Sequence, residues 1–212
     1  LASRQAPLLD TGRHGTVFGL AGWSGAGKTT LVEKLITHLV SLGLNVATIK
    51  HAHHQFDADV PGKDSYRHRT AGARQVLVSS AKRSVLFTEH GSAGDRPLDE
   101  LLSALVPADI VIVEGFKREP IPKIEIYRTA VGKPPLSPDD EWIVATATDA
   151  DNSDMIAGAP SIVLNLNDAS AIVDFISSLA ASVEEKKGVE SMDRPILSAN
   201  GTVEPIPRPE PP

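Results

Sequence analysis

The stretch GWSGAGKTT, Gly22 to Thr30, constrains this chain more than any other part of its sequence. Residues 22–29, which we call the glycine loop, match the pattern G-x-x-x-x-G-K-[ST] and lie between a β-rich run and an amphipathic helical run. In that context the glycines permit a turn whose backbone amides point at a phosphate group, and the helix dipole adds about half a positive charge. The sequence therefore predicts a phosphate-binding loop at the start of a helix.

Short β-rich runs alternate with helical patterns along the chain, and the most apolar of them, VIV and IVA, suit strands that are buried on both faces. The β-rich runs are 16–22, 44–50, 74–80, 84–89, 109–115, 123–128, 141–148 and 161–166, and the helical patterns are 28–42, 64–73, 97–105 and 168–184. This alternation predicts an α/β fold with a doubly wound, mostly parallel sheet, like that of P-loop NTPases, and with some antiparallel strand pairing.

Length and composition set the expected organisation and exclude several classes of protein. A chain of 212 residues suits one nucleotide-binding domain over 16–185, with an N-terminal extension over 1–15 and a Pro-rich tail over 186–212. The net charge of -6 argues against nucleic-acid binding, and the absence of cysteine excludes thiolate metal sites. No segment approaches the roughly 18 apolar residues of a membrane span, so we expect a cytoplasmic protein that does not bind membranes.

The residues that end the glycine loop predict a nucleotide site with magnesium. Lys28 should reach the β- and γ-phosphates, and the Thr29 hydroxyl should bind Mg²⁺. A site of this kind needs an acidic residue at the end of a second buried strand, and Glu114 in DIVIVEG is the candidate. Glutamate stands there where aspartate is commoner.

Base identity cannot be read from local patterns. The guanine-reading sequence N-K-x-D is absent, and Trp23 stands where an extra lysine marks one group of dimeric ATPases. Asp149, Asn165 and Asp168 follow late strands, where a base-reading loop could lie.

Residues 49–73 hold His51, His53, His54 and His68 between a predicted strand and a predicted helix. Neutral imidazoles bind zinc or nickel, so one interpretation is a metal site. A second is an anion site, formed by Lys50, His51, Lys63, Arg67 and Arg69, and a third is a solvated polar loop. The spacing of these residues does not decide among the three.

Four stretches together resemble the molybdopterin-guanine dinucleotide biosynthesis protein B (MobB) family. They are GWSGAGKTTL, IKHAHHQFDADVPGKDSYRHRTAGA, EGFKREPIPKIEIYR and ATATD, and they follow the family's order over about residues 16 to 168. The histidine-containing stretch is the most specific, because the glycine loop occurs in many other families. The Pro-rich tail and the start of the chain lie outside the family pattern.

The resemblance implies a GTP-binding, weakly GTP-hydrolysing accessory protein of molybdenum cofactor biosynthesis that uses GTP and Mg²⁺. It also implies a homodimer that works with a MobA-like guanylyltransferase and with molybdopterin. It gives Asp59 as a second acidic candidate and places Lys63, Asp64, Arg67 and His68 over the nucleotide or the pterin phosphate, with Lys117 and Arg118 adding positive charge.

The complete set of expected site residues follows from the resemblance and from the patterns above. The expected nucleotide contacts are Gly22, Ser24, Gly25, Ala26, Gly27, Lys28, Thr29, Thr30, His51, Lys63, Arg67, Lys117 and Asp149; the catalytic candidates are Lys28, Asp59 and Glu114; the metal ligands are Thr29, Glu114 and Asp59.

Two other functions fit parts of the sequence. A metal-delivery GTPase would use His51, His53 and His54, and a small-molecule kinase would use Asp59 or Asp64 as a base. At the nucleotide site we expect slow hydrolysis, nearer the roughly 10⁻⁴ per second of an unassisted switch than the rate of a motor protein, because the sequence places neither Gln55 nor Gln75 to orient water.

Overall fold

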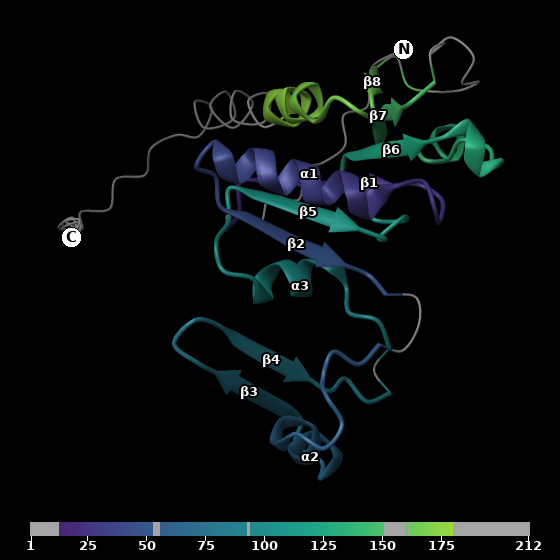
Figure 1. The fold of residues 1–212 in the computed structure, drawn as a ribbon. Coiled ribbons are helices and arrows are strands. Elements are labelled where there is room, and N and C mark those ends of the chain that lie inside the picture. Colours follow the sequence, from purple (N-terminus) through teal and green to yellow (C-terminus); the bar gives the residue numbers. More distant parts are fainter. Residues whose placement is uncertain (1–12, 53–55, 93, 151–159, 161, 180–212) are drawn as a thin grey trace, which may run out of the picture.

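The computed structural model of this chain describes residues 13–52, 56–92, 94–150, 160 and 162–179. They form a six-stranded parallel sheet with helices on both faces, and a two-stranded antiparallel pair that lies below the sheet in Figure 1. The predicted fold class, doubly wound and mostly parallel with some antiparallel pairing, is confirmed. The predicted tail over 186–212, and all but the last residues of the extension over 1–15, lie outside the described residues.

The strand order in the sheet is β2-β5-β1-β6-β7-β8, so the strand that precedes the glycine loop lies near the centre. Each predicted β-rich run contains one observed strand, slightly shorter than predicted. The strands are β1 (Thr16–Ala21), β2 (Val46–Lys50), β3 (Gln75–Ser79), β4 (Ser84–Thr88), β5 (Ile110–Glu114), β6 (Lys123–Tyr127), β7 (Ile143–Thr148) and β8 (Val163–Asn165), with short 3-10 helices η1 (Thr129–Val131) and η2 (Ser137–Asp139) between β6 and β7.

The helices begin close to where the sequence predicts them. They are α1 (Lys28–Ser41), α2 (Asp64–Thr70), α3 (Leu98–Ala104) and a helical segment over residues 169–179. The helix predicted over 64–73 is shorter than expected, because Gly72 takes a left-handed conformation with φ of 103° that ends the helix. The last part of the helix predicted over 168–184 lies outside the described residues. None of the helices in the described part of the chain is long and apolar enough to cross a membrane.

Both faces of the sheet are buried, which explains the nearly all-apolar strands. On one face Leu31, Leu35 and Leu39 of α1 pack with Ile172 and Ile176 of the helical segment over 169–179. On the other face Leu98 and Leu102 of α3 pack against β5 and β1. Helices that cover a parallel sheet in this way fix its strands, and therefore fix the positions of the loops at their carboxyl ends.

We call α2, β3 and β4 the hairpin unit, and Arg69 of α2 holds it together. Its Nε and Nη1 donate to Glu89 and Asp57 at 2.7 and 2.8 Å, and Nη1 also reaches Asp59 at 3.1 Å. The guanidinium also lies 5.1 Å from the centre of the Phe87 ring. Arg69 therefore joins α2 both to the segment before it and to β4.

A buried ion pair at the start of β6 joins two loops. Lys123 on β6 has only 2% of its surface exposed, and its Nζ donates to the carbonyls of Lys117 and Glu119 and pairs with Asp140, each at 2.9 Å. Glu125, two residues along the same strand, accepts from backbone N–H groups in the loop that contains Asp140. Since a buried lysine needs all of these partners, β6 fixes both loops at once.

We expect Arg69→Met to loosen the hairpin unit in a pH-dependent way. Hydrogen bonds from Arg69 lower the pKa of Asp57; burial alone would raise the pKa of Asp59, but hydrogen bonds from Ser65, the Val60 amide and Arg69 lower it overall. Both native pKa values lie below the ordinary 3.8, so the two ionised carboxylates stabilise the folded chain fully at pH values well above 3.8. This stabilisation is lost as the pH falls through the lower native pKa values.

Thermal unfolding of the chain and of Arg69→Met, at neutral pH and at about pH 3, tests this expectation. The variant should unfold at a lower temperature at neutral pH, and the gap should narrow in acid. Arg83→Met removes an exposed arginine from the turn between β3 and β4 and serves as the control. A gap of equal size at both pH values would contradict the assignment.

Candidate functional site

The glycine loop is compact because its glycines adopt backbone conformations that other residues avoid. Gly22, Gly25 and Gly27 have φ values of 145°, 81° and 96°. A Cβ at Gly22 would also lie 2.7 Å from the carbonyl oxygen of Ile126. The loop therefore closes against β6 and leads directly into α1, whose first-turn N–H groups lack a side-chain cap.

Lys28, the first residue of α1, points its ammonium group back into the loop. Its Nζ donates to the carbonyl oxygens of Gly22 and Trp23 at 2.8 and 2.9 Å. Burial lowers the pKa of Lys28 below its usual value, Glu114 opposes this, and the charges of Lys117 and Lys50 lower the pKa further. A partly desolvated cation among other cations attracts an anion, so the loop suits a phosphate group.

The parallel pairing of β5 with β1 and β2 brings Glu114 beside the loop. Glu114 lies opposite Leu20 on one neighbouring strand and Lys50 on the other, and Lys50 Nζ is 3.5 Å from its carboxylate. Thr29 is exposed in the first turn of α1. A hydroxyl and a carboxylate are oxygen ligands that Mg²⁺ accepts, so Thr29 and Glu114 are the residues of suitable chemistry for the predicted metal.

Trp23 lies within the loop and contacts two lysines, which sequence reasoning missed. Its Nε1 donates to the Pro134 carbonyl at 2.8 Å. Lys117 Nζ lies 5.1 Å and Lys133 Nζ 5.9 Å from the centre of an indole ring. These contacts connect the glycine loop to the loops that follow β5 and β6, and they hold Lys117, an expected nucleotide contact, near the loop.

Asp149 follows β7 and pairs with Arg128, the residue that follows β6. Arg128 Nη1 is 3.2 Å from the Asp149 carboxylate, and a Cβ placed on Gly27 would lie 3.6 Å from Arg128 Nε and Nη2. Asp149 was predicted as a site residue from its place at a strand end. Arg128 was not singled out, because the β-rich run predicted over 123–128 included it as the last residue, whereas the observed strand β6 ends at Tyr127.

His51 lies beside Glu114, because its backbone N–H donates to the Glu114 carbonyl at 2.8 Å. Its Nε2 is 3.2 Å from Asp95, and its ring lies 5.0 Å from that of Phe116. Within the described part of the chain, no group of three His, Cys, Asp or Glu residues could hold a metal ion. His53 and His54, which the metal-delivery hypothesis also needs, lie outside the described residues.

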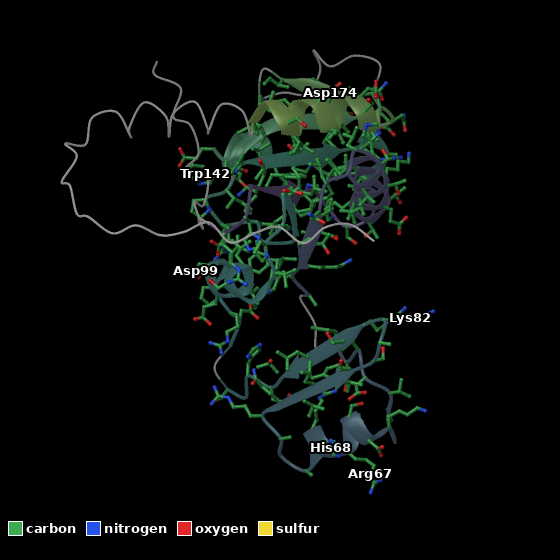
Figure 2. The ribbon with its side chains drawn as sticks, turned by 90° about the vertical axis from the view of Figure 1, so that its left-hand side faces the viewer. Arg67, His68, Lys82, Asp99, Trp142 and Asp174 are labelled. Atoms are coloured by element: carbon green, nitrogen blue, oxygen red, sulfur yellow. The ribbon has the colours of Figure 1, made fainter. Side chains whose placement is uncertain are left out.

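The predicted residues Asp59, Lys63, Arg67 and His68 lie in α2 of the hairpin unit or in the segment that leads into it. The Asp59 carboxylate is taken up by Ser65 and Arg69. Lys63 is the N-cap of α2, and Figure 2 shows Arg67 and His68 at the end of the hairpin unit that faces away from the sheet. The contacts of Asp59, Lys63 and Arg67 with nucleotide or metal stay predictions.

A parallel sheet whose central strand leads through a glycine loop into a helix defines a phosphate-loop α/β protein. The model of the MobB family, which is described as "Molybdopterin guanine dinucleotide synthesis protein B", matches residues 17–149. The chain belongs to this family.

Relatives agree with this assignment, and a solved structure shares the fold. A "Molybdopterin-guanine dinucleotide biosynthesis adapter protein" of Escherichia coli (strain K12) is 39% identical over 162 residues, which cover 76% of this chain and 90% of that protein. The protein of the same name from Haemophilus influenzae is 39% identical over 83% of this chain and 90% of its own length. A Bacillus subtilis MobB structure shares the fold, with a TM-score of 0.58 at 23% identity over 76% of this chain and 96% of that one.

We expect Trp23 to report binding at the loop. Negative phosphate charge should draw Lys117 away from the indole ring, since a cation–π contact at an exposed site contributes only about 0.5–1 kcal/mol. The chain has two tryptophans, so Trp142→Phe leaves Trp23 as the sole tryptophan, whose indole can be excited at wavelengths where tyrosine does not absorb. Titration of this variant with GTP and Mg²⁺ should change its emission, and adding Lys117→Met should reduce the change. Unaltered emission while calorimetry detects binding would refute the expectation.

Proposed function

We propose that this chain is a GTP-binding adaptor in the formation of molybdopterin guanine dinucleotide. The observation that carries the proposal is its 39% identity, over most of both chains, to a protein named as an adapter in that biosynthesis. The proposed partners are a MobA-like guanylyltransferase and molybdopterin. Neither is identified by a contact in the described residues, so the family supports them and the geometry supports only the nucleotide site.

In this proposal the nucleotide lies along the carboxyl edge of the sheet. Amides of the glycine loop and of the start of α1 receive the phosphates, and Lys28 neutralises the β- and γ-phosphates. Thr29 and Glu114 hold Mg²⁺, which requires Glu114 to exchange its contact with Lys50 for the metal. Bound magnesium would neutralise charge that develops on the phosphates, while the protein positions them.

We propose that GTP hydrolysis at this edge of the sheet is slow. Gln75 is part of β3 in the hairpin unit, so the described residues place no glutamine beside the glycine loop to orient water; Gln55 lies outside them. Turnover should stay far below about one per second without a partner, as in switches that await an activating protein. The bound nucleotide would then control when the adaptor acts on its partner, and the chain itself would catalyse little hydrolysis.

Calorimetry with GTP and with ATP, each with Mg²⁺, tests the nucleotide site. We expect GTP to bind more tightly than ATP, and Lys28→Ala to weaken GTP binding by about 10- to 100-fold, since a charged hydrogen bond is worth roughly 1.5–3 kcal/mol. Lys34→Ala, an exposed lysine of the same helix, is the matched control and should bind normally.

The variants should unfold at the same temperature as the unsubstituted chain, so that lost binding is not lost folding. Equal affinity for GTP and ATP would reject guanine specificity. Full GTP affinity in Lys28→Ala would move the nucleotide away from the glycine loop.

The hairpin unit offers a surface for the proposed homodimer. Leu77 and Leu86 lie opposite each other in the antiparallel pair, and 66% and 55% of their surfaces are exposed. Their neighbour Val76, whose side chain lies on the other face of the pair, is buried. A pair of exposed leucines on a short sheet suits burial against a second copy of the chain.

We therefore expect Leu77→Glu to produce monomers, because the charge would be buried in the dimer. Sedimentation or light scattering at micromolar concentration measures the mass. Val106→Glu places the same charge at another exposed apolar position and should remain dimeric. A dimer that survives Leu77→Glu would exclude this face, and a monomeric unsubstituted chain would reject the homodimer.

A further inference from the structure

Arg128 differs from an arginine that only stabilises the fold. Arg69 uses Nε, Nη1 and Nη2 to donate to surrounding carboxylates. Arg128 has one ion pair among the described residues, from Nη1 to Asp149, and its buried Nε has no hydrogen-bond partner there. A guanidinium carries five N–H donors, so Arg128 keeps most of its binding capacity unused.

Arg128 lies against the glycine loop. A Cβ on Gly27 would be 3.6 Å from Nε and Nη2 and 3.8 Å from Cζ, which places the guanidinium directly over the N-cap of α1. Asp149 follows the next strand, β7, and its carboxylate lies 3.2 Å from Nη1 of the guanidinium. A cation held between a helix start and a carboxylate, with free donors, is arranged to bind an anion.

The strand order says which part of a nucleotide would meet it. Glu114 is on β5, on one side of β1, and Lys28 is coupled electrostatically to it, so the γ-phosphate and the metal belong on that side. Arg128 follows β6, on the other side of β1, about 4.8 Å away in the sheet. A chain of phosphates that starts near Glu114 and crosses the loop therefore reaches Arg128 with its α-phosphate.

We propose that Arg128 is a nucleotide-binding residue that donates to the α-phosphate, with Asp149 as the carboxylate that positions it. This inference rests on the proposed function, because it needs a nucleoside triphosphate at the glycine loop. It assigns a role to a residue that the glycine-loop pattern does not include, and it gives the site a cation at each end of the triphosphate.

Two probes, GTP with Mg²⁺ and inorganic tripolyphosphate with Mg²⁺, test the assignment by calorimetry. Arg128→Met should weaken both by about 10- to 100-fold, because both present a phosphate at this position. Arg128→Lys should bind better than Arg128→Met but below the unsubstituted chain, because lysine keeps the charge and loses the fork of donors. Arg83→Met is the matched control and should leave both affinities unchanged.

Asp149→Asn separates direct contact from an indirect role. If Arg128 served only to hold Asp149 for the base, Arg128→Met and Asp149→Asn would weaken GTP alike and leave tripolyphosphate unchanged, which would overturn the proposal. Unchanged GTP affinity in a folded Arg128→Met would overturn it as well, without touching the proposed function. If the unsubstituted chain bound tripolyphosphate, and bound GTP and ATP with equal affinity, guanine specificity would be rejected. The role of Arg128 at the phosphate would stand, provided that Arg128→Met weakened all of them. Binding of neither probe would reject both.

Discussion

The parallel register of β2, β5, β1, β6 and β7 is the constraint on which the site depends. Parallel strands end at the same edge, so residues far apart in the chain meet there in a fixed order. Lys50 and Glu114 lie on one side of the glycine loop, and Arg128 and Asp149 lie on the other. Before any ligand binds, each side of the site thus has its own ion pair, Lys50 with Glu114 near Lys28 and Arg128 with Asp149 at the far end. Loss of that register would separate the charges even if every side chain were kept.

The sequence predicted those parts of the molecule whose signals are local. The glycine loop is defined by consecutive residues, and the strands by short apolar runs, so both were placed correctly. Glu114 could be predicted to lie near the loop because a buried strand and its final carboxylate are adjacent in sequence. The contacts of Trp23 with Lys117 and Lys133 could not be predicted, since they depend on how two loops fold back over a third.

The segment over residues 49–73 shows where prediction from the sequence fails. Residues 49–73 hold many charged groups, and sequence alone cannot say which of them are used within the fold. Arg69 engages Asp57, Asp59 and Glu89, so a carboxylate that resembled a metal ligand is occupied by a neighbouring side chain. The sequence gives no sign that Arg69 and Arg128 differ in role. Their surroundings in the fold show that Arg69 donates from Nε, Nη1 and Nη2, whereas Arg128 has one ion pair and an Nε without a partner among the described residues.

The buried ammonium of Lys123 has a consequence for how this site can evolve. Because it binds carbonyls of Lys117 and Glu119 together with the carboxylate of Asp140, neither loop can change length or path without disturbing the other. Substitutions in the two loops should therefore show epistasis, and sequence drift should preserve them as a matched pair. A chimera that exchanged residues 115–122 alone would combine a new loop with the old loop around Asp140, and the two would no longer be matched to the same buried ammonium group.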